Sequence, residues 1–291
     1  MSDDAEIFEA HRAPLLALAY RMLGEIGRAE DIVQDAWLRW SGRAHDEAIA
    51  SPRAYLATLV TRLCLNELAS ARHRKEESRG DRLPEPVALE PLGLDRIEAL
   101  ERVSMAFLVV LQRLTPAERA VLLLHDVFDF EHAEIAGLIG KTDGASRKLL
   151  ERAKESLERE KRLLVASRED HERLLGAFVR AAYAGDAAAL VSLLAEDATI
   201  TTDGGASGRG IDGFRNLKVP LSGAEHVASF VVMATRRGSV SLTSEIRDVN
   251  GMPALVLRSA EGPFGVITLG VADGRIARVY FHADAARLDH V

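Results

Sequence analysis

A basic stretch at residues 131–154 carries the clearest signal for chemistry, because its pattern is that of a helix-turn-helix. A short apolar helix is followed by Gly140 at a tight turn and by Thr142, which can cap the next helix. Helix-turn-helix proteins insert the start of their second helix into the major groove of DNA. An ordinary helical hairpin with a solvated charged face has the same pattern, so this segment alone leaves both interpretations open.

The second helix of this segment carries the side chains that would meet DNA. Residues 141–154 hold five basic and two acidic residues, a charge of +3. Four basic residues can point outward there, namely Arg147, Lys148, Arg152 and Lys154, while Leu149, Leu150 and Ala153 are expected to face inward. Such a basic stripe is the electrostatic footprint expected of a nucleic-acid contact.

Charge elsewhere in the chain divides by segment. Residues 52–79 hold six basic and three acidic residues, again +3, whereas residues 1–51 hold five basic and ten acidic residues, or −5. The net charge of −7 taken alone argues weakly against a nucleic-acid binder. Because charges more than about 8–10 Å apart are screened at physiological salt, that global figure does not exclude local DNA contacts.

Helices are expected to position these residues through the first half of the chain. Apolar residues recur at helical spacing over 11–23, 28–40 and 52–75, and Ser51-Pro52 is typical of a helix start. Prolines at 84, 86 and 91 interrupt this pattern, so residues 79–95 are predicted to form a semi-rigid linker or a docking segment. Helices resume from residue 94 to about 164, with a capping box at Thr115-Pro116-Ala117-Glu118.

The last third of the chain changes character. Helical stretches at 171–184 and 187–194 are followed by β-rich runs, which lie at 227–234, 239–249, 254–259, 265–271 and 276–282. Asn250-Gly251, Glu261-Gly262 and Asp273-Gly274 are hairpin signals between the later runs. This order favours an α+β domain with a curved antiparallel sheet.

Composition narrows the class of protein. Cys64 is the only cysteine of 291 residues, which excludes an intrachain disulfide framework and any CxxC metal site. No secretory signal is apparent, and no apolar run reaches the ~18–20 residues that a membrane span needs. We therefore expect a soluble, cytoplasmic, multidomain protein without a metal site or a cofactor.

Residues 29–40, Ala-Glu-Asp-Ile-Val-Gln-Asp-Ala-Trp-Leu-Arg-Trp, resemble the region 2 core-binding helix of bacterial sigma factors, most closely the extracytoplasmic-function group. Residues 53–75 then fall on the segment that meets the promoter −10 element, and 115–157 fall on region 4 with its −35 helix-turn-helix. The remainder is similar to the cone-shaped SnoaL-like α+β domains. Leu83-Pro84-Glu85-Pro86 and Asp203-Gly204-Gly205 point to the subgroup that carries such a domain fused at its C-terminus.

The resemblance implies a multidomain fold of two all-α helical domains followed by one α+β cone. Region 2 would occupy 1–78, the proline-rich linker 79–95, region 4 96–165 and the SnoaL-like domain 166–291. The implied function is to direct RNA polymerase to specific promoters, with the fused domain modulating that activity. The implied partners are promoter DNA and core RNA polymerase, through the clamp of its largest subunit and its flap.

The resemblance also assigns site residues, by the motif that each one occupies. The polymerase-binding residues are Asp31, Gln34, Asp35 and Trp37. The −10 residues are Arg62, Asn66, Arg72 and Arg74, and the −35 residues are Arg147, Lys148 and Arg152. The interdomain regulatory residues are Leu83, Pro84, Glu85, Pro86, Asp203, Gly204 and Gly205.

Two other functions stay open at this point. The chain could be a DNA-binding regulator that senses a small, unidentified ligand in the cone. It could also be an isomerase- or cyclase-type enzyme, because related cones use a buried acid or histidine in an apolar pocket. The candidates for that chemistry are Asp203, Arg209, Tyr280 and His282. Asp203 begins a glycine-rich segment whose composition is typical of a loop. We therefore expect a protein that is not an enzyme.

Overall fold

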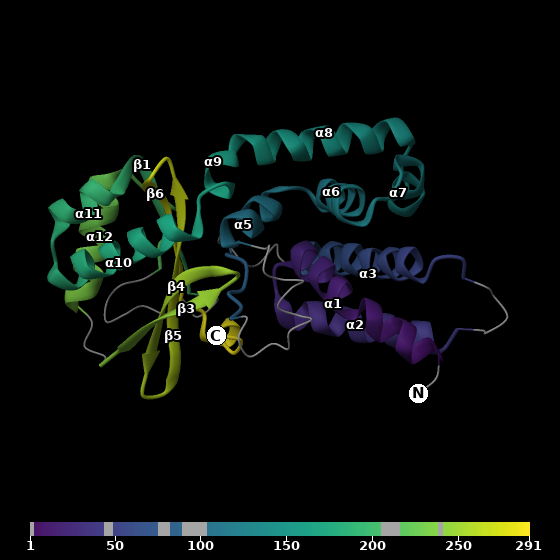
Figure 1. The fold of residues 1–291 in the computed structure, drawn as a ribbon, viewed down its shortest axis with the longest axis horizontal. Helices are drawn as coiled ribbons and strands as arrows, with labels where there is room; N and C mark the ends of the chain where they lie inside the picture. Colours follow the sequence, from purple (N-terminus) through teal and green to yellow (C-terminus); the bar gives the residue numbers. More distant parts are fainter. Residues whose placement is uncertain (1–2, 44–48, 75–81, 89–103, 205–215, 238–240) are drawn as a thin grey trace. The chain divides into compact units, whose positions relative to one another are not determined.

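The computed structural model describes residues 3–43, 49–74, 82–88, 104–204, 216–237 and 241–291 (Figure 1). The chain divides into two compact units. The helical unit comprises residues 1–77, 93–100 and 108–160, and the sheet unit comprises 78–92, 101–107 and 161–291. Each unit is described by itself below. The finer division into 1–78, 79–95, 96–165 and 166–291 stays a prediction.

The helical unit is built from amphipathic helices. Its helices are α1 (Asp3–Leu23), α2 (Ile26–Ser41), α3 (Pro52–Arg74), α6 (Pro116–Phe128), α7 (His132–Ile139) and α8 (Asp143–Arg159). The helix α5 (Met105–Arg113) enters this unit from Leu108 onward. Trp40 and Tyr20 are the largest fully buried side chains here, and their burial supplies a hydrophobic core shared by α1 and α2.

Local sequence signals fix where these helices begin and end. The capping box predicted at the start of α6 is confirmed, because Thr115 Oγ1 accepts from Glu118 N at 3.3 Å and Glu118 Oε2 accepts from Thr115 N at 3.0 Å. Gly140 ends α7 at φ +66°, and Thr142 Oγ1 accepts from Ala145 N at 3.2 Å to cap α8. The predicted helix-turn-helix is therefore present in the fold.

A buried arginine of α6 contacts the end of α1. Arg119 of α6 is 3% exposed, and its guanidinium donates to the carbonyl oxygens of Met22 and, at 3.3 Å, of Leu114. Met22 lies in the last turn of α1, where carbonyl groups lack partners within the helix. Burial lowers the pKa of Arg119 to about 10, so the group stays charged at neutral pH and balances that helix end.

The sheet unit contains one six-stranded sheet in the order β2-β1-β6-β5-β4-β3. Its strands are β1 (Leu194–Asp203), β2 (Leu221–Ser222), β3 (Thr243–Val249), β4 (Met252–Ser259), β5 (Gly262–Ala272) and β6 (Arg275–His282). β3 to β6 form an antiparallel meander, while β1 runs parallel to β6 with Asp203 beside His282. The ends of β1 and β6 therefore bring an acid and a histidine together.

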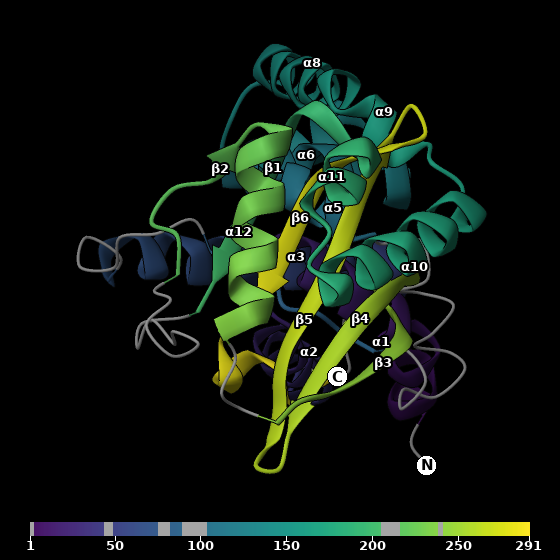
Figure 2. The same ribbon diagram turned by 90° about the vertical axis from the view of Figure 1, so that its left-hand side faces the viewer.

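Helices cover one face of this sheet, as Figure 2 shows. They are α10 (Arg168–Ala184), α11 (Ala187–Leu193) and α12 (Ala224–Arg237), and a cluster that includes Phe178, Val227 and Leu269 forms the core between the two layers. The short helix α9 (Lys161–Leu164) and the start of α5 pack against Ala272 and Ala277. A short 3₁₀ helix, η2 (Ala285–Arg287), follows β6.

The structure confirms the hairpins and corrects two other predictions. Asn250 and Asp273 adopt positive φ, 52° and 51°, as the two-residue turns Asn250-Gly251 and Asp273-Gly274 require. The predicted strand at 227–234 is wrong, because these residues lie in α12. Valine there suggested β structure, but Val227, Ala228 and Val231 share a helix face that packs on the sheet. The strand β1 was not predicted, because acidic residues interrupt its alternation.

Candidate functional site

The outer face of α2 carries the acidic residues assigned to polymerase. Ile32, Val33 and Ala36 are buried and set the orientation of the helix. Asp31, Gln34 and Asp35 are all exposed, as their spacing of three and four residues predicts. The three side chains therefore share one solvent-facing surface on which they can act together.

Two apolar residues border this acidic face. Trp37 is only partly exposed, since its ring packs against Phe8 with centroids 5.1 Å apart. Trp37 and Gln34 line a groove of about 570 Å³ between α1 and α2. Leu38 is 59% exposed and lies three residues after Asp35. Leu38 is not among the predicted site residues, although its spacing from the acids places it on the same face of the helix.

The helix α3 presents part of the surface assigned to the −10 element. Arg62 and Asn66 are exposed and one turn apart, while Leu63 and Cys64 face the interior. Burial raises the pKa of the Cys64 thiol, so Cys64 is a core residue rather than a nucleophile. Arg72 and Arg74 belong to the last turn of α3, and their side chains lie outside the described residues.

The start of α8 carries the residues assigned to the −35 element. Arg147, Lys148 and Arg152 are exposed, and Leu150 and Ala153 are buried against the rest of the unit. The Arg147 guanidinium lies 3.3 Å from an Asp143 carboxylate oxygen. Because both side chains are largely solvent-exposed, that ion pair contributes little and leaves Arg147 able to contact DNA.

Side chains behind this basic surface join α6, α7 and α8. His132 Nδ1 lies 3.0 Å from Ser146 Oγ, and the His132 ring stacks on His125 with centroids 4.8 Å apart. Asp126 is 2.7 Å from His125 Nδ1 and 3.0 Å from Lys154 Nζ. We call these five residues the polar bridge. Helical spacing alone could not predict the polar bridge, because its members come from three separate helices.

The segment 82–88 lies against the sheet unit to which it belongs. Residues 83 to 88 are all buried, and the segment runs from the end of β1 to the end of β3. Leu83 N donates to Asp203 Oδ2 at 3.0 Å, and Arg287 donates to the same oxygen at 2.9 Å. Glu85 Oε1 lies 2.9 Å from His290 Nδ1.

Backbone pairing holds the other end of this segment. Asn250 N donates to Val87 O at 2.8 Å, and Val87 N donates to Asn250 Oδ1 at 3.2 Å. Ala88 bridges Val249 in antiparallel fashion and donates its N–H to His290 O at 2.8 Å. Residues 83–88 of the linker are thus held along the sheet unit, which favours a docking segment over a free spacer for this part of the linker.

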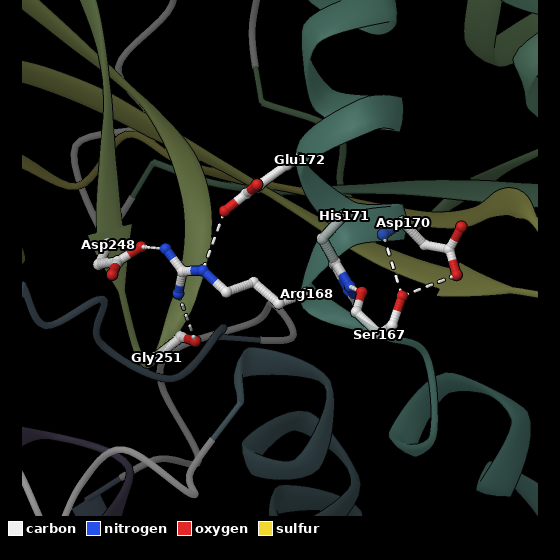
Figure 3. A network of polar contacts seen from close by, with 7 residues as sticks. All are labelled: Ser167, Arg168, Asp170, His171, Glu172, Asp248 and Gly251. Carbon is white, nitrogen blue, oxygen red and sulfur yellow. Dashed lines mark hydrogen bonds and ion pairs between the residues drawn. The ribbon is translucent and has the colours of Figure 1, made fainter.

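An arginine network fixes the hairpin that receives Val87 (Figure 3). Arg168, the first residue of α10, donates to Glu172 at 2.9 Å, to Asp248 at 2.5 Å and to the Gly251 carbonyl at 3.4 Å. Asp248 and Gly251 flank Asn250 in the turn between β3 and β4. Arg168 therefore connects the start of α10 to the turn that pairs with the linker.

The residues considered for catalysis are engaged in this linker contact or buried. Asp203 is 6% exposed and forms an ion pair with Arg287. Burial, and then the Arg287 charge, lower the pKa of His282 to about 3, so its imidazole is neutral. Tyr280 is 3% exposed. Arg209 and Gly205 lie outside the described residues, whereas a Cβ at Gly204 would meet the Asn216 side-chain amide, which would have to shift.

A small cavity lies within the sheet unit. This cavity, lined by Ser104, His171 and Thr268, among others, holds about 10 Å³, enough for one water molecule. Within the described ranges, no three His, Cys, Asp or Glu side chains gather closely enough to hold a metal ion. Over the same ranges, no helix is long and apolar enough to cross a membrane.

Comparison with known proteins gives consistent matches. The family model for sigma-70 region 2 matches residues 7–74, and that for sigma-70 region 4 matches residues 104–157. The Mycobacterium tuberculosis ECF RNA polymerase sigma factor SigJ is 35% identical over 288 residues, which cover 94% of this chain and 89% of SigJ. The probable ECF RNA polymerase sigma factor SigI of the same species is 30% identical, covering 97% and 93%.

A solved structure agrees over nearly the full length. The crystal structure of the extracytoplasmic-function sigma factor SigJ superposes with a TM-score of 0.75 at 30% sequence identity, covering 98% of each chain. The match includes both the helical segments and the α+β domain that follows them.

Proposed function

The chain belongs to the extracytoplasmic-function (ECF) RNA polymerase sigma factors, and on that premise we propose how its surfaces divide the work of promoter recognition. As a member of that family it directs RNA polymerase to specific promoters at transcription initiation. Its C-terminal part is the SnoaL-like α+β domain expected from the sequence. Since polymerase and promoter DNA are its partners, we place its site of action in the cytoplasm.

The acidic face of α2 is our proposed dock for the clamp of the largest polymerase subunit. Three exposed polar residues, Asp31, Gln34 and Asp35, support this role, because clustered charges of one sign steer a partner of opposite charge. Trp37 adds an aromatic edge to the same surface. We assign the flap of the polymerase to the region 4 helices, by family resemblance.

Two basic surfaces are our proposed promoter contacts. Arg62 and Asn66 on α3, with Arg72 and Arg74 at its end, would hold the −10 strand as it opens. On α8, Arg147 and Lys148 would read bases of the −35 element from the major groove, and Arg152 would bind a phosphate.

The fused domain is proposed to restrain the connection between regions 2 and 4. The observation that carries this proposal is the buried pairing of Leu83–Ala88 with Asp203, Asn250 and His290. Met105 and Ala106, at the other end of the connection, are also buried in the sheet unit. Holding both ends shortens the free tether, which limits how far region 4 can move from region 2.

This proposal makes the domain a contact device rather than a catalyst. Asp203 and His282 lie side by side at the ends of β1 and β6, and Asp203 is already paired with Leu83 N–H and with Arg287. The Asp203 carboxylate is thus engaged in contacts with the linker backbone and with Arg287, which suits a contact residue. No observation favours the ligand-sensing alternative over restraint by contact.

Run-off transcription on the upstream region of the gene tests the function. The full-length chain and a version lacking residues 166–291 are each combined with core polymerase. We expect a specific transcript from the full-length chain and a changed transcript level from the shortened one. If neither protein gives a specific transcript, the promoter-directing assignment fails; if both give equal amounts, the restraint by the fused domain fails.

A further inference from the structure

The polar bridge behind the −35 surface has no role in the contacts proposed so far. Its central member, His132, is 8% exposed, and Ser146 is fully buried. Asp126 reaches α8 through Lys154, and His132 reaches α8 through Ser146. Side chains of α6 and α7 therefore hold the recognition helix at two points along its length.

The hydrogen bond between His132 and Ser146 lies next to the residues that are proposed to recognise −35 bases. Ser146 directly precedes Arg147 and Lys148, and each residue of an α-helix turns it by about 100°. A bond that fixes Ser146 inward therefore fixes the directions in which Arg147 and Lys148 leave the helix. Without that bond, a buried hydroxyl would lose its partner, and α8 would be free to rotate or fray at its start.

We propose that His132 is the positioning residue for the recognition helix and that it acts only as a neutral imidazole. It does not contact DNA; it holds Ser146 so that Arg147 and Lys148 reach the bases together. This inference rests on the proposed −35 role of those two residues. It adds a dependence on pH to promoter reading.

Charged groups around His132 explain that dependence. Arg147 of α8 and His125 of α6 disfavour a second positive charge there, whereas Asp143 of α8 and Glu131 at the start of α7 favour one. Beyond His125 lie Asp126 and Lys154, which pair with each other. Burial is the largest influence, and the balance lowers the pKa of His132 from its usual 6.5.

The sign of the pH effect follows from that direction. In the folded state His132 binds a proton less tightly than it does in the unfolded state. The contribution of neutral His132 to the stability of the fold is therefore complete above about pH 6.5. It is lost as the pH falls from there through the lower pKa of the folded state. Acid should therefore loosen the start of α8 and weaken −35 discrimination.

The test uses full-length protein with core polymerase. Wild-type holoenzyme first selects −35 sequences from a random duplex pool, and the readout is its affinity ratio for selected over scrambled −35 DNA. At pH 7.5 we expect His132→Phe and Ser146→Ala each to lower this ratio about 3- to 10-fold, the usual range for one buried hydrogen bond. The double variant should lose no more than either single one, since both remove the same contact.

A conservative variant separates positioning from simple structural support. In His132→Asn the amide places a polar atom where Nδ1 lies, so it should retain the ratio at pH 7.5. As the pH falls from 7.5 to below the folded-state pKa of His132, the wild type should lose discrimination, while His132→Asn should keep it. As a matched control, His226→Asn replaces an exposed histidine of α12 and should preserve the wild-type pH profile.

Three outcomes would overturn the inference. They are an unchanged ratio in both His132→Phe and Ser146→Ala, a loss in His132→Asn equal to that in His132→Phe at pH 7.5, and identical pH profiles for wild type and His132→Asn. The variant Arg147→Ala tests the proposed −35 role separately from the positioning role of His132. If Arg147→Ala lowers the ratio and His132→Phe does not, positioning by His132 fails alone; if neither does, the proposed −35 role of Arg147 fails as well.

Discussion

At the scale of single residues, α2 separates the side chains that build the helical unit from those available to a partner. Helical periodicity predicted correctly that Asp31, Gln34 and Asp35 would be exposed, because their neighbours Ile32 and Val33 must be buried. The same reasoning could not find the pairing of Asp203 with Arg287, which lies 84 residues further along the chain. Spacing reports on one helix face, whereas partners from distant segments are set by the whole fold.

Reversing a charge on the acidic face should weaken polymerase binding without affecting the fold. We expect Asp31→Arg and Asp35→Arg each to lower affinity for core polymerase about 10-fold at low salt. The difference should shrink at high salt, because the charges are exposed and screened. A pull-down over a salt series, with Glu225→Arg on α12 as the matched control, measures this; equal affinity of all three variants would remove Asp31 and Asp35 from the dock.

The buried contacts of Arg119 are expected to stabilise the helical unit. Arg119→Met should lower the free energy of unfolding by about 2–3 kcal/mol, because two buried carbonyl groups, of Met22 and Leu114, lose a charged donor. Scanning calorimetry of the full chain would show this as a lower transition temperature for the helical unit. The control Arg152→Met changes an exposed residue, and its melting curve should match the wild type within about 0.5 kcal/mol.

At the scale of elements, helix ends were more predictable than strands. Capping and turn residues act locally, so Thr115, Thr142 and Gly140 were identified from sequence and occupy those positions in the fold. Strand identity depends on neighbours: α12 has valines that favour β structure, yet packing on the sheet makes it a helix. β1 was missed because its parallel partner, β6, lies about 80 residues later.

Two helix-ending glycines offer a matched pair for measuring helix termination. Gly24 and Gly140 both have positive φ, 75° and 66°. A Cβ at Gly140 would meet open space, whereas one at Gly24 would come within 2.2 Å of Gln112 Nε2. We expect Gly140→Ala to cost about 1 kcal/mol of stability and Gly24→Ala to cost more.

The excess at Gly24 can be isolated by a second substitution. Replacing Gln112 by Ala removes the clash, so the double variant Gly24→Ala/Gln112→Ala should cost only its backbone strain plus the effect of Gln112→Ala alone. Denaturant or thermal melts give the free energy of unfolding of the wild type, of each single variant and of the double variant, which completes the double-mutant cycle. Strict additivity of the two single changes would show that Gln112 does not restrict this helix end.

At the scale of the whole molecule, the net charge of −7 conceals a segregation of charge. Residues 1–51 carry −5, whereas 52–79 and 141–154 each carry +3, so the acidic and basic surfaces belong to different segments. The fused domain adds the proposed restraint of the linker. Its hold on Leu83–Ala88 uses residues from β1, from the β3–β4 turn and from the segment after β6.

Releasing that hold should raise promoter-dependent transcription. Asp203→Ala removes the acceptor of Leu83 N–H and leaves Arg287 without this ion pair, so we expect several-fold more transcript and faster amide exchange at Leu83. Asp203→Asn keeps an acceptor and should have a smaller effect. Asp197→Ala, an exposed acid on the same strand, should behave as the wild type. Transcript levels that do not follow amide exchange would argue against a role for the linker.

The linker contact also has a consequence for the order of synthesis on the ribosome. His290 lies 205 residues after its partner Glu85, and a ribosome adds about 5–20 residues each second. For on the order of 10–40 s, a nascent chain carries its linker without the histidine that will hold it. The helices α2 and α3 are already synthesised when that interval begins, and α8 is completed within it. Under the proposed restraint, regulation by the fused domain is imposed late on each new molecule, and a translation stall after region 4 would leave a nascent sigma factor without that restraint.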